Sequence, residues 1–193
     1  MSADTSETPT PATLPHDLTG ITVSYSGGKS DGTVINDQTP GIIVAANYTD
    51  GITETPSGWK VNNPGIINMN GPQDFIIEYQ GKQAKLTLQA DVPIEYQNAL
   101  EKASQYSEMM HMSRQGIYEQ LTSQYGEQFD QQAAQYAVDH LNADYNANAL
   151  AKAQDYQSQM SMSTNAIRDQ LTSQYGEKFT QSEADYAIQH LNG

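Results

Sequence analysis

Residues 98–142 read NALEKASQYSEMMHMSRQGIYEQLTSQYGEQFDQQAAQYAVDHLN, and a near copy of this stretch follows at residues 148–192. The two copies are identical at 26 of 45 positions, and the heptapeptide LTSQYGE recurs unchanged at residues 121–127 and 171–177. A repeat of this length indicates one structural unit built twice, because each copy has the same apolar face to bury. The C-terminal half of the 193-residue chain is therefore a tandem repeat.

Within each copy, apolar residues recur at steps of three and four, which is the period of an amphipathic helix. In the first copy this face comprises Tyr96, Ala99, Leu100, Ala103, Tyr106 and Met110. Ser113 and Ser163 stand where a second helix needs an N-cap. Asp130 and Thr180 stand before a third helix, and Thr180 forms a capping box with Glu183.

Gly126 and Gly176 follow the second helical run and suit the left-handed C′ position that ends many helices. Each copy is thus predicted to have three helices in a helix–turn–helix-like arrangement. The expected bounds are residues 92–143 for the first repeat and 144–193 for the second.

The segment from Leu18 to Ala90 has a different period, since apolar and polar residues alternate along it. Such alternation indicates strands with one buried face. Asp50-Gly51 and Gln80-Gly81 lie between alternating runs and predict hairpin turns. Several short strands separated by Gly, Asn and Pro favour a small β-sandwich over residues 18–91. Residues 1–17, rich in Ser, Thr and Pro, are expected to form a disordered linker.

The runs LTGITVSYSGG, NYTDG and IEYQGKQAKLTL resemble the bacterial immunoglobulin-like domains of Gram-positive cell-surface proteins. The resemblance covers residues 18–90 and implies a spacer or adhesive module. The fold class is therefore multidomain β plus α, with a small Ig-like β-sandwich followed by two tandem three-helix repeats.

The motifs NALxKAxxYxxxMxMS, IxxQLTSQYGExF and YA[VI]xHLN resemble the repeat of the host-cell-surface-exposed lipoproteins, called Ltp, over residues 95–193. The resemblance implies a secreted protein on the extracellular face of a bacterial membrane, held there only by a lipid anchor. It also implies superinfection exclusion, in which a temperate phage blocks DNA injection by another phage. The family's signal sequence and lipid-bearing cysteine are missing, so either this sequence begins after them or the chain is anchored differently.

The chain has a formal net charge of −14, and its helical half has five Lys and Arg residues against 13 Asp and Glu residues. A nucleic-acid-binding protein needs basic side chains to displace the counterions of phosphate. Although a helix–turn–helix can place a recognition helix on DNA, the charge here has the wrong sign. We therefore expect no nucleic-acid partner, and we expect a monomer.

No catalytic, metal-binding or cofactor-binding residue is expected. His140 and His190 occupy the same position at the end of the third helix, where a histidine caps or packs. Met109-Met110-His111-Met112 resembles a soft-metal site, but the second copy reads Gln159-Met160-Ser161-Met162 and lacks the histidine. Methionine at this spacing normally fills a core. Since P-loop, Gly-x-Ser-x-Gly and His-Glu-x-x-His motifs are also missing, we do not expect an enzyme.

Four acidic residues are the candidates for partner binding because they recur in both copies: Glu119 with Asp169, and Glu127 with Glu177. Such residues are often simply solvated, but a repeated acidic patch also attracts a basic protein segment. The resemblance implies that this partner is a phage tape-measure protein. A structural or adhesive cell-surface protein, whose Ig-like domain binds wall or host material, is the alternative.

Overall fold

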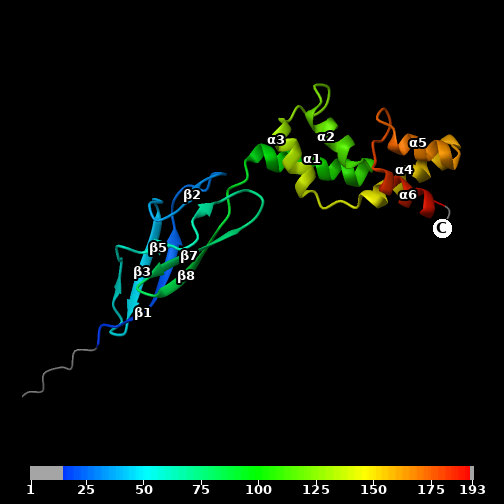
Figure 1. Cartoon of the computed structure of the whole chain (residues 1–193). Coiled ribbons are helices and arrows are strands. Elements are labelled where there is room, and N and C mark those ends of the chain that lie inside the picture. Colours follow the sequence, from blue (N-terminus) through cyan, green and yellow to red (C-terminus); the bar gives the residue numbers. More distant parts are fainter. Residues whose placement is uncertain (1–14, 192–193) are drawn as a thin grey trace, which may run out of the picture. The chain divides into compact units, whose positions relative to one another are not determined.

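The computed structural model of the chain describes residues 15–191. The chain divides into two compact units, and the boundary along the sequence falls between Asp91 and Val92 (Figure 1). Within the described residues, the first unit contains eight strands and the second contains six helices. The prediction of a β-sandwich followed by helical repeats is confirmed.

The strands of the first unit form antiparallel sheets with the orders β1-β3-β4, β5-β7-β8 and β2-β6. Their bounds are β1 Leu18–Tyr25, β2 Val34–Ile35, β3 Ile42–Tyr48, β4 Thr53–Glu54, β5 Lys60–Val61, β6 Gly65–Ile66, β7 Gln73–Tyr79 and β8 Lys82–Leu88. The pair β2 and β6 is too short to show any alternation, which is why β2 was not predicted from the sequence.

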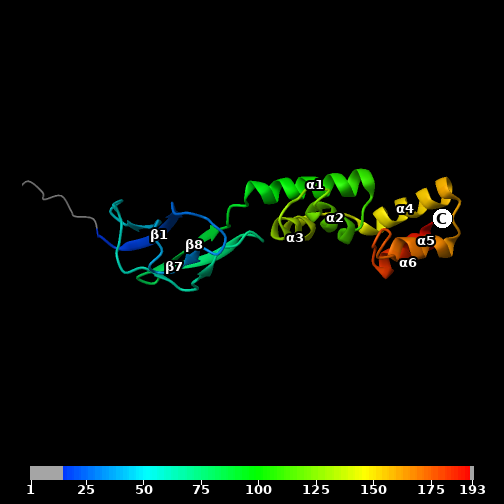
Figure 2. The ribbon, with the colours of Figure 1, turned by 90° about the horizontal axis from the view of Figure 1, so that it is seen from above.

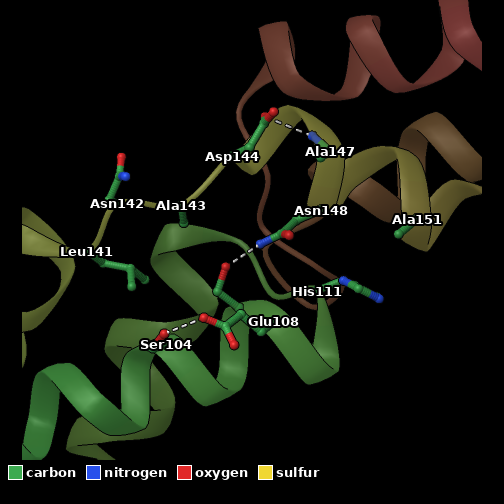
Figure 3. A pocket seen from close by; sticks show the side chains of 11 residues that line it. Ser104, Glu108, His111, Leu141, Asn142, Ala143, Asp144, Ala147, Asn148 and Ala151 are labelled. Carbon is green, nitrogen blue, oxygen red and sulfur yellow. Dashed lines mark hydrogen bonds between the residues drawn. The ribbon is translucent and has the colours of Figure 1, made fainter.

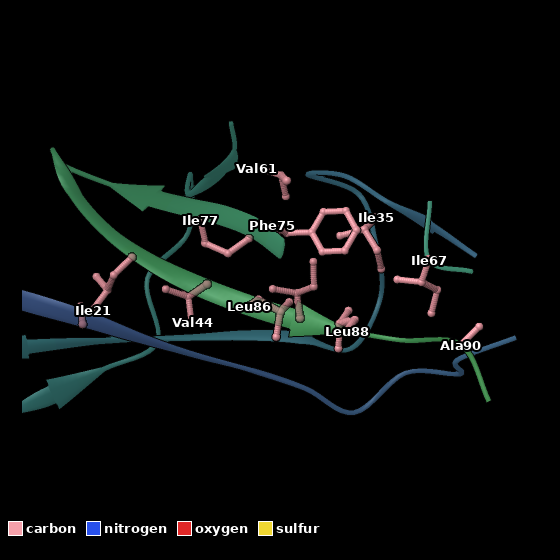
Figure 4. Close-up of a cluster of buried hydrophobic side chains, with 12 residues drawn as sticks. Ile21, Ile35, Val44, Val61, Ile67, Phe75, Ile77, Leu86, Leu88 and Ala90 are labelled. Carbon is pink, nitrogen blue, oxygen red and sulfur yellow. The ribbon is translucent and has the colours of Figure 1, made fainter. Parts of the chain in front are cut away.

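Alternate residues of the long strands point into one core between the sheets (Figure 4). Ile21 and Val44 come from the first sheet, and Phe75, Ile77 and Leu86 come from the sheet of β7 and β8. Each such side chain contributes about 1.5–3 kcal/mol when it is removed from water. The period-two pattern of the sequence therefore identifies the buried face of each long strand.

Both predicted hairpins are present. In the turn between β7 and β8, Tyr79 pairs with Lys82, so that Gln80 and Gly81 alone form the loop. Their φ angles of 47° and 76° are both positive, as a two-residue turn of type I′ requires. Asp50-Gly51 lies in the turn between β3 and β4, as predicted, and Gly51 has a φ of 83°.

The linker expected over residues 1–17 lies outside the described residues except for its last three. The His16 ring stacks on the Tyr48 ring at a centroid distance of 3.9 Å, and its Nδ1 lies 2.7 Å from Asp50 Oδ2. The Asp17 main-chain N–H donates to Thr49 Oγ1 at 3.1 Å. These contacts attach the start of the described chain to the turn between β3 and β4.

The second unit contains two repeats of one long and two short helices (Figure 2). The helices are α1 Ile94–Met110, α2 Arg114–Thr122, α3 Gln131–His140, α4 Tyr145–Met160, α5 Thr164–Thr172 and α6 Gln181–His190. The predicted caps are confirmed. Ser113, Ser163 and Asp130 accept a hydrogen bond from the main-chain N–H three residues later, and Thr180 with Glu183 forms the capping box.

Each repeat has its own core, and small residues of the long helix form its centre. Ala99 and Ala103 of α1 are fully buried, as are Ala149 and Ala153 of α4. Around them pack the branched side chains of the shorter helices, Ile117 and Leu121 in repeat 1 and Ile167 and Leu171 in repeat 2. Because alanine has only one methyl group, the shorter helices approach the long helix closely.

The apolar face predicted for the first helix is wrong at its last member. Met110 is 51% exposed, whereas Ser107, one turn earlier, is buried. Periodicity alone could not reveal this, because Ser107 faces the second repeat. The Asn148 side-chain amide covers it, and Nδ2 of Asn148 donates to Ser107 Oγ at 2.8 Å.

The prediction that Gly126 and Gly176 occupy a left-handed position is also wrong. The left-handed residues of this turn are Gln128 and Lys178, with φ angles of 58° and 59°, whereas the φ of neither glycine is positive. A Cβ at Gly126 would overlap with the main-chain carbonyl oxygen of Gln120, which accepts a hydrogen bond from the Glu127 N–H at 3.3 Å. Glycine is therefore needed here for the close approach of two main chains.

The two repeats pack against each other through polar groups. Asn148 of α4 is only 7% exposed, and its Nδ2 also donates to the Met112 main-chain carbonyl at 3.0 Å. Ser113 is 1% exposed, and its Oγ donates to the Glu177 main-chain carbonyl at 2.5 Å. Beside Asn148 lies an open cavity of about 320 Å³, with Glu108, Asp144 and Ala151 on its walls (Figure 3).

We expect Gly126→Ala to lower the free energy of unfolding of the helical unit by about 1–3 kcal/mol, because the new methyl group collides with a main-chain atom. The control is Gly116→Ala in the same repeat, since repeat 2 already has Ala166 at the equivalent position. Denaturant unfolding followed by circular dichroism gives both values. A Gly126→Ala variant as stable as the control would contradict this reading of the turn.

Asn148→Ala should lower the free energy of unfolding of the helical unit by about 1–3 kcal/mol, because it leaves the Ser107 hydroxyl and the Met112 carbonyl without their donor. Asn98 occupies the equivalent position in repeat 1 and is exposed, so Asn98→Ala should change stability by less than about 0.5 kcal/mol. The same unfolding measurement compares the pair. Equal losses in both variants would show that the interface between the repeats does not depend on Asn148.

Candidate partner-binding surface

The charges of the helical unit are unevenly matched. Each of its five basic side chains lies in an ion pair: Lys102–Glu127, Arg114–Asp139, Lys152–Glu177, Arg168–Asp185 and Lys178–Glu119. Of the 13 carboxylates in this unit, the other eight therefore have no cationic partner within residues 92–191. The excess negative charge remains at the surface and attracts cationic groups of another molecule.

Two of these ion pairs join the second helix of a repeat to the third, through different residue positions in the two repeats. Arg114 of α2 pairs with Asp139 of α3, and Arg168 of α5 pairs with Asp185 of α6. The positions are not equivalent in the two copies, yet each pair joins the second helix of its repeat to the third. Both arginines are therefore engaged in joining helices.

Glu127 and Glu177 hold the turn after the second helix against the long helix. Glu127 Oε1 accepts a hydrogen bond from the Tyr106 hydroxyl at 2.7 Å and lies 3.3 Å from Lys102 Nζ. Glu177 accepts from the Tyr156 hydroxyl at 2.5 Å, and its Oε2 lies 3.6 Å from Lys152 Nζ. The same three residue types form the same contacts in both repeats, so these glutamates have a structural function.

Hydrogen bonding and burial shift the ionisation of this cluster. The Tyr106 hydroxyl, together with Lys102, holds the pKa of Glu127 below its ordinary value. Burial raises the pKa of Tyr106 and of Tyr156, and the neighbouring glutamates raise it further. Glu127 is therefore ionised at neutral pH while both tyrosines keep their protons.

Glu119 and Asp169 occupy equivalent positions but have different surroundings. The Glu119 carboxylate accepts from Gln115 Nε2 at 2.8 Å and pairs with Lys178, which belongs to the second repeat. The Gln115 hydrogen bond and Lys178 lower the pKa of Glu119. Asp169 of α5 is exposed, and none of residues 15–191 contacts its carboxylate as a hydrogen-bond donor or cation. The four predicted residues thus differ in availability, since three have partners within the fold.

Sequence reasoning missed two exposed aromatic residues beside this surface. Tyr125 and Tyr175 are 100% and 102% exposed, and each lies two residues before a structural glutamate. The sequence repeat alone does not distinguish them from Tyr106 and Tyr156, whose hydroxyl groups bond to Glu127 and Glu177 within the fold. The useful signal is the neighbouring glycine, which marks a tight turn whose preceding side chain points outward.

Nowhere in residues 15–191 do three or more histidine, aspartate or glutamate side chains lie close enough together to hold a metal ion. His140 and His190 each place Nδ1 within 2.8 Å of the main-chain carbonyl four residues earlier, and each stacks on a tyrosine. No helix in the described part of the chain is long and apolar enough to cross a membrane.

The sequence profile of the host cell surface-exposed lipoproteins matches the chain twice, over residues 94–141 and 144–191. Among solved structures, the chain is similar to Ltp, a superinfection exclusion protein from the Streptococcus thermophilus temperate phage TP-J34. The two are 48% identical over 53% of this chain and 100% of that chain, with a TM-score of 0.49. No curated protein matches. The two profile matches coincide with the two three-helix repeats, and the chain belongs to the family of host cell surface-exposed lipoproteins.

Proposed function

We propose that this protein blocks DNA injection by an incoming phage, from the outer face of the host cell, by binding a cationic segment of a phage protein. One observation carries the proposal: the five basic residues of the helical unit are all paired internally, and eight carboxylates have no cationic partner. A surface of this kind attracts lysine-rich and arginine-rich polypeptide and repels phosphate.

The similar solved protein is a superinfection exclusion protein, which supports the same activity for this chain. The resemblance to the Ltp lipoproteins implies that this phage protein is the tape-measure protein. Glu127 of repeat 1 recurs as Glu177 of repeat 2, and Tyr125 recurs as Tyr175. A partner with two basic stretches gains affinity from this duplication without any new type of contact.

Tyr125 and Tyr175 extend the proposed surface beyond the four acidic residues Glu119, Glu127, Asp169 and Glu177. An exposed aromatic ring next to carboxylates binds the face of an arginine or lysine side chain through a cation–π interaction. Tyrosine is also enriched among the residues that contribute most to protein interfaces. We therefore include both tyrosines in the site.

Neutralising the four acidic residues tests the proposal. We expect Glu119→Gln, Glu127→Gln, Asp169→Asn and Glu177→Gln together to reduce protection against phage at least about tenfold, because charge at an interface governs the rate of encounter. Phage adsorption and DNA injection are measured on cells that display the chain. A comparison variant neutralises Glu95, Glu101, Glu108 and Asp155, which removes the same net charge from carboxylates outside the four repeated positions. It should reduce protection less than the first variant does, and an equal loss would show that only the total charge of the unit matters.

A double variant separates the effect of surface charge from the effect of protein stability. Tyr106→Phe with Tyr156→Phe removes the hydrogen bonds of both structural glutamates but keeps every charge. This variant should lose about 1 kcal/mol of unfolding free energy per hydrogen bond and still protect the cell. Normal injection into cells that display the unaltered chain would refute the proposed function, and a change in adhesion alone would favour the adhesive alternative.

A further inference from the structure

The interface between the repeats joins two different surfaces. Repeat 1 contributes the Met112 carbonyl, Ser113 and Glu119, which we call the covered face. Repeat 2 contributes the Asn148 amide, the Glu177 carbonyl and the Lys178 ammonium group. Such a head-to-tail contact does not close on itself. Repeat 2 has its own copy of the covered face, and the serine and the acidic residue of this copy are exposed.

That copy is formed by Met162, Ser163 and Asp169, which we call the terminal face. Its local geometry matches the covered face: the Met162 N–H donates to the Tyr156 carbonyl at 3.2 Å, and the Met112 N–H donates to the Tyr106 carbonyl at 3.3 Å. Ser163 caps α5 as Ser113 caps α2. The difference is exposure, since Ser113 is buried while Ser163 and Asp169 are both exposed. The main chain at Met162 and the Ser163 side chain therefore have the same local contacts as Met112 and Ser113.

The covered face shows what kind of group fits. Lys178 has a left-handed main chain, and its ammonium group pairs with the Glu119 carboxylate. The main-chain carbonyl of the preceding residue, Glu177, accepts a hydrogen bond from the Ser113 hydroxyl. A turn that carries a lysine next to a free main-chain carbonyl satisfies both groups at once. Asp169 and Ser163 offer the same pair of partners on the terminal face.

A second copy of this chain is a poor occupant of the terminal face. Its first repeat would present Gln128 where Lys178 stands in the second, so the contact with Asp169 would lack a cation. Gln157 occupies the position equivalent to Ser107, so repeat 2 lacks the hydroxyl that accepts from the Asn148 amide in the covered face. Charge therefore favours a different, lysine-bearing partner.

We propose that the terminal face of repeat 2 is the docking site of the cationic partner segment, which binds Asp169 and Ser163 through a lysine-bearing turn as Lys178 and Glu177 bind repeat 1. This inference rests on the proposed function and narrows it to one end of the helical unit. It predicts that Asp169 contributes more to partner binding than the other carboxylates without a cationic partner.

Asp169→Lys, introduced into the full chain displayed on cells, tests the assignment. Protection against phage DNA injection should fall at least about tenfold, because a like charge then meets the partner's lysine. Asp155→Lys is the matched control, since it makes the same charge change at another exposed position of the same repeat and should reduce protection much less. Both variants should keep the melting temperature of the unaltered chain.

The outcomes separate the inference from the function on which it rests. Full protection by Asp169→Lys would overturn the terminal face and leave the proposed function intact, as would equal losses in Asp169→Lys and Asp155→Lys. Failure of the unaltered chain to protect would remove both. Because the chain has no cysteine, Thr164→Cys with a photoactivatable maleimide places one crosslinker beside Ser163. Crosslinks to a basic segment of the phage protein during infection support the site, whereas crosslinks between two copies of the chain overturn it.

Discussion

The small size of each repeat is the constraint on which the helical unit depends. A three-helix repeat of about fifty residues leaves much of its surface in water and is marginally stable alone. The cores of both repeats are centred on alanines of the long helix, which bring the helices close but bury little apolar area each. Additional fixation comes from polar contacts: the tyrosine and glutamate pair within each repeat, and the Asn148 and Ser113 contacts between repeats.

This construction explains why the surface charge is so one-sided. Every lysine and arginine of the helical unit is needed to join one helix to another or one repeat to the next. The carboxylates outnumber them, so the helical unit keeps an excess of negative charge that acts on other molecules. Structural ion pairs and the proposed binding activity are thus two consequences of one composition. The four repeated acids illustrate this, since Glu127 and Glu177 stabilise a turn while Asp169 faces solvent.

The elements of the fold follow from local sequence signals, whereas the partners of individual side chains do not. The serine, aspartate and threonine caps, the hairpin turn at Gln80-Gly81 and the paired three-helix repeats were all predicted, because each depends on residues close together in the chain. The burial of Ser107 and the pairing of Glu119 with Lys178 depend on residues 41 and 59 positions away. Gly126 shows a third limit, since the same residue type can serve either a left-handed main chain or a close approach, and only the geometry distinguishes them.

The differences between the two copies carry as much meaning as their identities. If both repeats had kept a lysine at the position of Lys178, the first repeat of one molecule could pair with Asp169 of another, and a head-to-tail contact of this type would extend into a filament. Repeat 1 has the uncharged and exposed Gln128 at this position. The lysine therefore persists where the fold requires it and is missing where it would promote self-association. Asp169 keeps its negative charge at the opposite end, which leaves that end selective for a cation that the chain itself does not supply.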